Sequence, residues 1–467
     1  MTTLETFLRP DFMSVPTRFH TTIPHSSIPR IPLTMETLIH FPGPDWHPLK
    51  RKNRFPTVDK RIRLYMSNWF QPPCTSKSKI AYTLQYDANA FPTLKCNSEN
   101  AHNVYESIVQ PDVKLVLDTE TMLDCGRPLQ QWKKEGARKR TDKRIHKRSN
   151  LWNYCYNAIE ILNMTHNLNN NNNNANDGRT NVFTPVILQM GDEKSLTKST
   201  VPYIAKFRPQ LSQEEIERVT KKSTCNERQH ATTGVGNRPE TDGFVPIVWN
   251  LNTARHFGSF SKARSEDIPW NQKKLGTLWR GFMTGFMIDG PETTELEQCL
   301  SNVRCRFVYE TNLRGDSSLI NAALIGVYSR YKGGSTCNGV TLVAPNRSSF
   351  EDLQQYKVLV VLEGNDVSSA LKWNLMSNSV ILMPPPTRTS WAMEELLEPW
   401  VHYVPIHRNL SNLEEMIQWV GNNDDFARRI SERATLYIYD LWLSPEAKKE
   451  DIKVKRGILD RYRKYWL

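Results

Sequence analysis

The segment Val358–Pro386 reads VLVVLEGNDVSSALKWNLMSNSVILMPPP and sets a local order of structural elements. Its first five residues are all apolar, which predicts a strand buried on both faces, as in a parallel sheet. Gly364 permits a tight turn, and Ser368–Met376 predicts a helix. A second apolar run, Ser379–Met383, predicts another strand, which three prolines end. Because such crossovers are right-handed, the first loop should lie at the carboxyl edge of the sheet, where α/β proteins bind ligands.

This loop does not identify a ligand by its sequence. It contains neither the GxGxxG pattern of dinucleotide sites nor the GxxxxGK[ST] pattern of P-loops. Asn365 and Asp366 suit a turn or a helix N-cap equally well. Binding of a phosphate by backbone N–H groups and a purely structural turn are therefore both open on this evidence.

The rest of the chain extends the α/β pattern. Apolar runs that end in polar or glycine residues predict strands at residues 184–192, 201–209, 245–256, 277–281 and 400–406. Helical spacing predicts helices at residues 149–166 and 350–357 and two more within 409–442. Residues 1–112 are rich in Pro, Thr and Ser and predict an irregular, partly disordered N-terminal arm.

Charge and cysteine content limit the partners. The chain has 467 residues and a net charge of +12, which favours an anionic partner. Much of the excess lies in KKEGARKRTDKRIHKR (133–148), which is either a solvated surface or a contact for nucleic acid or membrane. Eight cysteines include no Cys-x-x-Cys pair, so a zinc site is not expected, while disulfides stay open.

Targeting signals are not evident in the sequence. No window approaches eighteen uninterrupted apolar residues, and the first residues lack the layout of a secretory signal. We therefore expect a soluble chain without a signal peptide or transmembrane segment.

Three ordered blocks carry a family resemblance. They are WRGFMTG, YKVLVVLEGNDVSSALKWNLMSNSVILMPPP and LEPWVHYVPIHRNLSNLEEMIQWVGNNDDFARRISERA. Together they resemble glycosyltransferase family 90, which includes capsule-associated fungal enzymes and animal protein O-glucosyltransferases. The GND-x4-LKW-x3-SNSV variant is more similar to the lipopolysaccharide glycosyltransferase branch. The resemblance covers roughly residues 184–441.

The resemblance implies a GT-B-like fold, in which two Rossmann-like domains face a cleft. On this reading residues 113–265 form an acceptor-side domain with Asn-rich and polar insertions, and residues 266–467 bind the nucleotide sugar. It implies transfer of a hexose or pentose from a nucleotide diphosphate sugar, with UDP as the expected nucleotide, to a hydroxyl of a saccharide or glycoprotein. Neither a prosthetic group nor a metal is expected. Relatives in eukaryotes generally work in the lumen of the endoplasmic reticulum or Golgi, but the location of this chain stays unknown.

The family motif maps onto named residues of this sequence. Cations must neutralise the diphosphate as the glycosidic bond breaks, and Arg280 in WRG is the first choice. Lys372 is a second cation, unless it lies along Trp373 as a structural side chain. The complete predicted nucleotide-sugar site is Arg280, Gly281, Thr284, Glu363, Gly364, Asn365, Asp366, Ser368, Ser369 and Lys372.

Two positions depart from the family's animal branch, and two further residues complete the predicted cleft. Glu363 and Ala370 stand where that branch has arginines, so phosphate binding must differ here, and Glu363 could hold a ribose or sugar hydroxyl. Asp192, at the end of a strand, matches the family's catalytic base. Arg208 is a further cleft residue, suited to an acidic acceptor.

Two other functions stay open at this point. A catalytically inactive protein could keep the fold and use the basic segment to hold an anionic partner. Nucleic-acid binding rests on net charge alone and is not expected, while peripheral membrane association is possible. The lone residues His256 and His402 suit structural roles better than catalysis.

Overall fold

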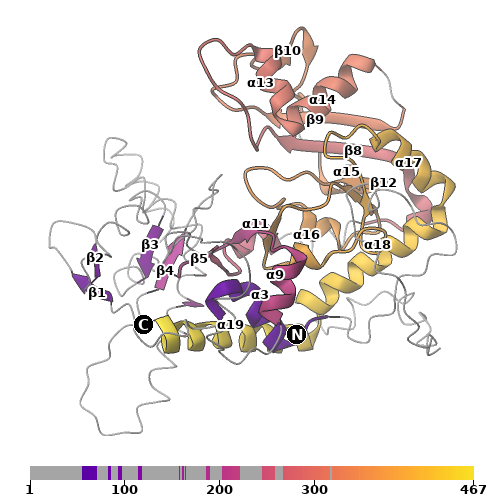
Figure 1. Cartoon of the computed structure of the whole chain (residues 1–467). Coiled ribbons are helices and arrows are strands. Elements are labelled where there is room, and N and C mark those ends of the chain that lie inside the picture. The colour runs from indigo at the N-terminus through magenta and orange to yellow at the C-terminus, as the bar shows by residue number, and fades with distance from the viewer. Residues whose placement is uncertain are drawn as a thin grey trace, which may run out of the picture. The chain divides into compact units, whose positions relative to one another are not determined.

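The computed structural model describes the second half of the chain almost completely and the first half in pieces (Figure 1). The described residues are 55–70, 82–85, 93–96, 114–117, four helical positions between 157 and 164, 186–189, 202–220, 245–257 and 267–466, except 316–317 and 347. All of them lie in one compact unit, residues 41–467. Asp192 and the basic segment 133–148 lie outside the described residues.

A five-stranded parallel sheet forms the centre of the C-terminal half. Its strands are β8 (Lys274–Phe282), β9 (Ile320–Gly326), β12 (Tyr356–Val360), β13 (Val380–Met383) and β15 (Val404–Pro405). Their spatial order is β9-β8-β12-β13-β15, and every neighbouring pair is parallel. Counted along the chain this order is 2-1-3-4-5, which is common in doubly wound sheets. The predicted α/β class is therefore confirmed, and the sheet is Rossmann-like.

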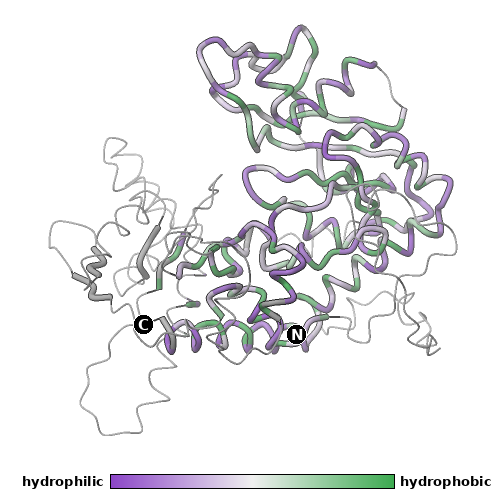
Figure 2. Tube along the Cα trace, viewed as in Figure 1, coloured by the Kyte–Doolittle hydropathy of each residue, from purple (hydrophilic) through white to green (hydrophobic). Residues whose placement is uncertain are grey.

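The central strands are apolar on both faces because two cores sandwich them. Val358 and Leu382 face one core, which also contains Phe307 and Ile417. Ile381 faces the other core. Since side chains alternate along a strand, a continuous apolar run is what this double burial requires. Figure 2 shows hydrophobic residues running along these strands.

Helices cover this sheet and connect its strands. They are α13 (Glu295–Ser301), α14 (Val303–Arg314), α15 (Phe350–Gln354), α16 (Leu371–Asn374), α17 (Leu413–Asn422), α18 (Asp424–Ile438) and α19 (Pro445–Trp466). Short helical turns span Ser67–Phe70, Trp270–Gln272, Glu394–Leu396 and Tyr439–Leu443. A small hairpin pairs β10 (Thr336–Cys337) with β11 (Val340–Thr341). None of the described helices combines the length and apolar character needed to cross a membrane.

A second sheet of mixed direction lies in the N-terminal half. It has the order β3 (Lys114–Leu117), β4 (Val186–Gln189), β5 (Ile204–Ala205) and β7 (Ile247–Val248). The last three strands are parallel, and β3 is antiparallel to β4. The remaining elements of this half are β1 (Tyr82–Gln85), β2 (Thr93–Cys96), α9 (Gln213–Thr220) and α11 (Thr253–Phe257). The two-domain GT-B arrangement and its boundaries stay predictions.

One short strand joins the two halves. β6 (Phe207–Pro209) pairs antiparallel with β14 (Arg388–Ser390), which follows β13. The core behind the five-stranded sheet also contains residues from both halves, among them Trp249 and Trp391. The carboxyl ends of β5 and β6 therefore lie next to loops of the C-terminal half.

The predicted irregular arm contains a buried helix that the sequence pattern did not indicate. This helix, α3 (Val58–Met66), packs against α19, and Leu64 and Met66 are fully buried. Arg61 is buried as well, so the helix does not show a simple apolar face. The helix predicted at Ser368–Met376 is also shorter than expected, because α16 has only four residues and no side-chain N-cap.

Candidate functional site

Two loops meet at the carboxyl edge of the sheet, between β8 and β12. This is the point where the strand order reverses, and ligands of doubly wound sheets bind at such a point. The backbone N–H of Gly285, after β8, donates to Asn365 Oδ1 at 2.9 Å. A Cβ on Gly364 would overlap Thr284 Oγ1 and lie 3.1 Å from Arg304 Nη2. The structure therefore brings Thr284, Gly364 and Asn365 together, as the sequence predicted for one site.

Two residues hold these loops, Arg304 in α14 and Asn302 at the N-cap of this helix. Arg304 donates from Nη1 to the Phe282 carbonyl at 3.1 Å, and from Nη2 and Nε to the Leu362 and Glu363 carbonyls at 2.6 and 3.2 Å. Asn302 caps α14 and donates through its amide to the carbonyls of Thr284 and Phe286. A guanidinium therefore bridges the ends of β8 and β12.

A disulfide joins the two helices beside this bridge. It links Cys299 in α13 to Cys305 in α14, one residue after Arg304. The cysteine count alone left disulfides open, and the structure assigns this one. It fixes the start of the helix that carries Arg304.

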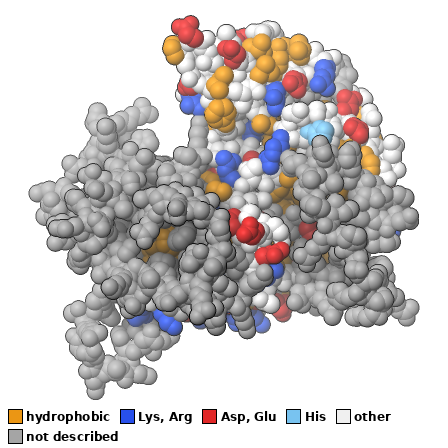
Figure 3. Space-filling model, in the orientation of Figure 1, with side chains coloured by type: hydrophobic (Ala, Val, Ile, Leu, Met, Phe, Trp, Pro, Cys, Tyr) orange, Lys and Arg blue, Asp and Glu red, His pale blue; other side chains and the backbone are white. Residues whose placement is uncertain are grey.

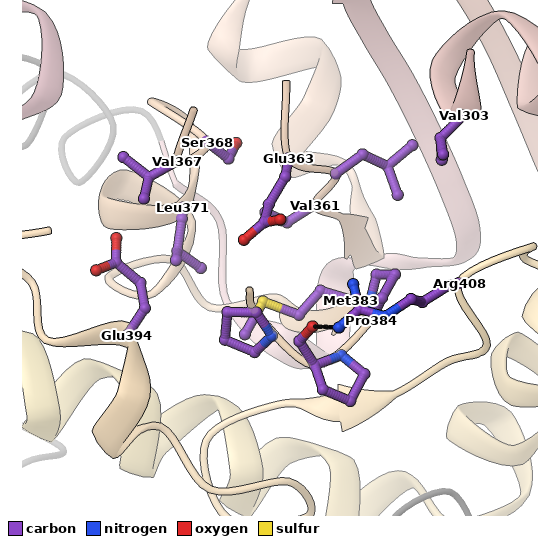
Figure 4. A pocket seen from close by; sticks show the side chains of 13 residues that line it. Val303, Val361, Glu363, Val367, Ser368, Leu371, Met383, Pro384, Glu394 and Arg408 are labelled. Atoms are coloured by element: carbon purple, nitrogen blue, oxygen red, sulfur yellow. Dashed lines mark hydrogen bonds between the residues drawn. The ribbon is translucent and has the colours of Figure 1, made fainter. Parts of the chain in front are cut away.

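A pocket lies beside the junction, at the ends of β12 and β13 (Figure 4). Its wall is mostly apolar, with Val361, Leu371 and Met383 among the lining residues. The polar side chains that line it are Glu363, Ser368, Glu394 and Arg408. Arg408, after β15, donates from Nη2 to the Pro385 carbonyl at 2.8 Å. An apolar pocket with a few charged groups is the usual form of a small-molecule site.

Glu363 forms part of the wall of this pocket. Its carboxylate accepts hydrogen bonds from the Thr387 N–H at 2.8 Å and the Thr387 hydroxyl at 2.5 Å. The guanidinium of Arg388 lies 3.7 Å away, and both side chains are 26% exposed. Glu363 thus anchors the turn that begins β14, and its remaining exposure leaves it within reach of a ligand in the pocket.

Arg280 lies away from the loop junction in this structure. Its guanidinium donates to the carbonyl of Trp279 at 2.8 Å and to Oδ1 of Asn321 in β9 at 2.9 Å. Partial burial lowers the pKa of Arg280, while Tyr356 and Asp352 raise it. Gly281 packs under the ring of Trp279, where a Cβ would approach ring carbons to 2.6 Å. The predicted role of Arg280 at the diphosphate stays a prediction, without support from its contacts.

Lys372 is fully buried. Its ammonium lies 2.7 Å from Glu394, and both side chains are at most 1% exposed. Glu394 also accepts from the N–H and hydroxyl of Ser390. Lys372 therefore forms a buried ion pair and does not occupy an exposed position on the loop. Ser368 is buried too, and its carbonyl accepts from the same ammonium at 3.5 Å.

The loop after β12 is also tied to the N-terminal half. Asp366 forms a buried ion pair with Lys206, which follows β5. Arg208 in β6 binds Glu395 through two hydrogen bonds of 2.9 and 2.8 Å, and both side chains are at most 2% exposed. Arg208 is therefore a buried structural cation here and does not face an acceptor.

Some predicted roles depend on atoms that are already engaged or outside the described part. The Gly364 N–H donates to the Asp366 carbonyl at 3.1 Å, so this donor is used within the loop. Ser369 is partly buried at the loop's end. Asp192 follows β4 but lies outside the described residues. Sequence reasoning did not single out Arg304, Arg408 and Asn302, because nothing in the local pattern marks them as facing the loops.

The described residues lack a cluster of metal-binding side chains. No group of three His, Cys, Asp or Glu side chains that could hold a metal occurs among the described residues. Basic and acidic side chains are interspersed over the described part of the face in Figure 3. Positive charge at the loop junction and the pocket comes from Arg304 and Arg408.

Comparison with family models points to the same family as the sequence blocks. Residues 319–443 match the model described as Glycosyl transferase family 90. This segment is similar to glycosyltransferase family 90. The resemblance carried by the sequence blocks is confirmed over β9 to α18, which includes the loop after β12 and the pocket beside it.

Curated proteins are similar to parts of this chain. The O-glucosyltransferase LpsA of Dichelobacter nodosus is 38% identical over 207 residues, which is 44% of this chain and 52% of that protein. Protein O-glucosyltransferase 3 of Rattus norvegicus is 35% identical over 97 residues, 21% of this chain and 19% of that protein. Uncharacterized protein 035R of Invertebrate iridescent virus 3 is 38% identical over 96 residues, 20% and 9% of the two chains. The chain thus spans about half the length of the bacterial relative and less of the others.

Proposed function

We propose that this protein is a glycosyltransferase that moves a sugar from a nucleotide diphosphate sugar, with UDP as the nucleotide, to a hydroxyl of a saccharide or protein. The observation that carries the proposal is the pocket beside the strand-order reversal of a family 90 Rossmann-like sheet. The relatives named O-glucosyltransferases support a hexose as the transferred sugar.

Arg304 is the cation that we assign to the diphosphate. Its guanidinium contacts the ends of both β8 and β12, so its positive charge lies beside the two loops that follow these strands. A guanidinium keeps its charge at all physiological pH values and binds phosphate oxygens in a fixed fork. Arg408, which lines the pocket, adds a second positive group. Charge that builds on the leaving diphosphate would be stabilised by these arginines without a divalent ion.

Asp192 is the base that we assign to the acceptor. A carboxylate at a strand end can take the acceptor proton as its oxygen attacks the anomeric carbon. A catalytically inactive binding protein is not favoured, because the similar proteins that carry a functional name are named O-glucosyltransferases.

The first experiment measures nucleotide binding by calorimetry. Wild-type protein is titrated with UDP, GDP and CDP in EDTA and then in magnesium. We expect UDP to bind in EDTA and Arg304→Gln to weaken it about tenfold to a hundredfold, the value of one or two charge-assisted hydrogen bonds. Arg306→Gln is the matched control, since Arg306 lies two residues along α14 and its side chain makes no hydrogen bond to the described residues.

The second experiment separates binding from turnover. Asp192→Asn should leave UDP affinity unchanged and reduce sugar transfer or donor hydrolysis about a hundredfold or more. Failure of folded wild-type protein to bind any of the three nucleotides would contradict the transferase proposal. Wild-type turnover in Asp192→Asn would contradict only the assignment of the base.

A further inference from the structure

A second, smaller cavity lies where the two halves of the molecule meet. It is lined by Trp249 and Asn250, which follow β7, by Ser390 at the end of β14, and by Trp391 directly after it. Val367, from the loop after β12, lines this cavity and the first pocket alike. The two cavities therefore share a wall residue.

Two polar atoms of this cavity's lining stand out. Trp249 is fully buried and Asn250 is 2% exposed. Neither the indole Nε1 of Trp249 nor the Oδ1 of Asn250 has a hydrogen-bond partner among the described residues. Other polar groups of the lining are engaged, since Lys206 pairs with Asp366 and the Ser390 hydroxyl binds Glu394.

Such atoms require an explanation, because a buried donor or acceptor without a partner costs roughly 1–3 kcal/mol. Native proteins satisfy nearly all of these groups with protein, water or ligand. Here the two atoms are of opposite kinds, since an indole N–H only donates and an amide oxygen only accepts. One hydroxyl group can accept from the first and donate to the second.

We propose that this cavity binds a hydroxyl group of the donor's sugar ring. The cavity measures about 10 Å³, close to the least space that holds one water-sized group, so it fits a hydroxyl and not a whole ring. With the diphosphate at the first pocket, the sugar crosses Val367 and reaches the second.

This inference rests on the proposed function. It means that residues of the N-terminal half determine the specificity for the donor's sugar. The C-terminal half would bind the nucleotide and its phosphates, which all donors share. The unpaired Nε1 of Trp249 and Oδ1 of Asn250 would instead distinguish one sugar from another. A site that hydrogen-bonds a substrate hydroxyl discriminates strongly against analogues that lack it.

The test compares a nucleotide with and without its sugar. Trp249→Phe keeps an aromatic ring and removes the donor, and Asn250→Leu removes the acceptor. Dissociation constants for UDP, UDP-glucose and UDP-xylose are measured for each variant. We expect at least one UDP-sugar to bind wild type more tightly than UDP, and each variant to lose about threefold to tenfold of that gain with UDP affinity unchanged.

The matched control is Trp279→Phe, the same change at a buried tryptophan of the five-stranded sheet, away from the cavity lining. It should leave the ratio of UDP-sugar to UDP affinity as in wild type. Thermal melting checks the fold. Trp249→Phe removes part of a fully buried ring as well as Nε1, so its melting temperature should fall about as far as that of Trp279→Phe.

The outcomes separate this inference from the proposed function. If wild type binds UDP and the affinity ratio is unchanged in both cavity variants, a bound water alone fills the cavity and the inference is overturned. If the variants instead raise only the Michaelis constant of the acceptor, the donor assignment is equally overturned. If folded wild type does not bind UDP at all, the proposed function fails first.

Discussion

Two regions hold the loops at the edge of the five-stranded sheet, and they use different kinds of contact. In the α13–α14 hairpin, Arg304 and Asn302 donate to backbone carbonyls at the ends of β8 and β12 and in the loop after β8. The β5–β6 segment of the other half uses buried ion pairs, Lys206 with Asp366 and Arg208 with Glu395. The first set of contacts lies within the C-terminal half, whereas the second crosses between the halves of the molecule.

The difference indicates a division between binding and folding. A buried ion pair gains little over apolar packing, but removal of one partner leaves an uncompensated charge in the interior. Hydrogen bonds from a partly exposed guanidinium to carbonyls can be replaced by water at smaller cost. Changes in the β5–β6 segment should therefore lower stability, and changes in the hairpin should mainly lower affinity for the donor.

The largest effect is expected for Arg208→Ala. Its side chain is fully buried and that of Glu395 is 2% exposed, so the variant buries an unpaired carboxylate. We expect a loss of about 3–5 kcal/mol in the free energy of unfolding, measured with urea. Arg428→Gln is the control, since its pair with Glu432 is 44% and 37% exposed and should change stability by less than about 1 kcal/mol. Equal losses in the two variants would remove the distinction between the regions.

Gly364→Ala tests the point where both sets of contacts converge. An added Cβ would overlap Thr284 Oγ1 and approach Arg304 Nη2 to 3.1 Å, so the two loops must separate. Overpacking of this kind costs roughly 1–3 kcal/mol, and we expect UDP affinity to fall about tenfold as the loops move apart.

The comparison for this variant is Gly290→Ala, in the loop before α13. Its added Cβ would meet only Thr293 Oγ1, at 3.1 Å, and neither loop of the site. Calorimetric titration with UDP should distinguish the two alanine variants. Unchanged affinity in Gly364→Ala would mean that the loop junction is not part of the nucleotide site.

The sequence predicted the two central strands well because they are buried on both faces. The runs that include Val358–Val361 and Val380–Met383 are continuous and apolar, and short runs of this kind bounded by turn residues are typical of strands inside a parallel sheet. The edge strand β9 was not predicted. The turn at Gly364 was also predicted, since a close approach there excludes a side chain. Local patterns thus located the edge at which the site lies.

The directions of the charged side chains could not be predicted in the same way. Lys372 and Arg280 stand in motif positions, yet one pairs with Glu394 and the other turns toward Asn321. These partners lie 22 and 41 residues away, so tertiary packing selects them. Arg304 was missed for the same reason, because its three carbonyl acceptors come from two other strands.

The disulfide of the hairpin gives a smaller expected effect. Cys299 and Cys305 are six residues apart, and closing a loop of this length stabilises a protein by roughly 2 kcal/mol in the chain-entropy model. The double variant Cys299→Ser, Cys305→Ser should lose about that much in urea unfolding. It should also weaken UDP binding, because the disulfide fixes the start of α14.

Treatment of wild type with a reducing agent should reproduce both losses of the double variant. Cys337→Ser is the control, since that buried thiol is free and lies outside the hairpin. A double variant with lower stability but wild-type UDP affinity would show that Arg304 keeps its place without the disulfide.

The smallest effect is expected at the first turn of α13 and depends on pH. Glu297 completes a capping box with Thr294, and the hydrogen bond from the Thr294 backbone N–H lowers the pKa of Glu297 below its value of 4.5 in the unfolded chain. Its stabilising contribution is therefore fully present above that value and is lost as the pH falls through the lower folded-state pKa.

Urea unfolding of wild type and Glu297→Gln should thus differ most near neutral pH and converge in acid. In a Thr294→Ala background the difference between Glu and Gln should depend less on pH, because the hydroxyl donor is gone while the backbone N–H of residue 294 is retained. Since the carboxylate is exposed, high salt should leave the hydrogen-bonded part of the effect and reduce the part due to Lys332. If the difference in unfolding free energy between wild type and Glu297→Gln instead grew in acid, the sign of this contribution would be reversed. The stability of the hairpin would then depend on charges other than that of Glu297.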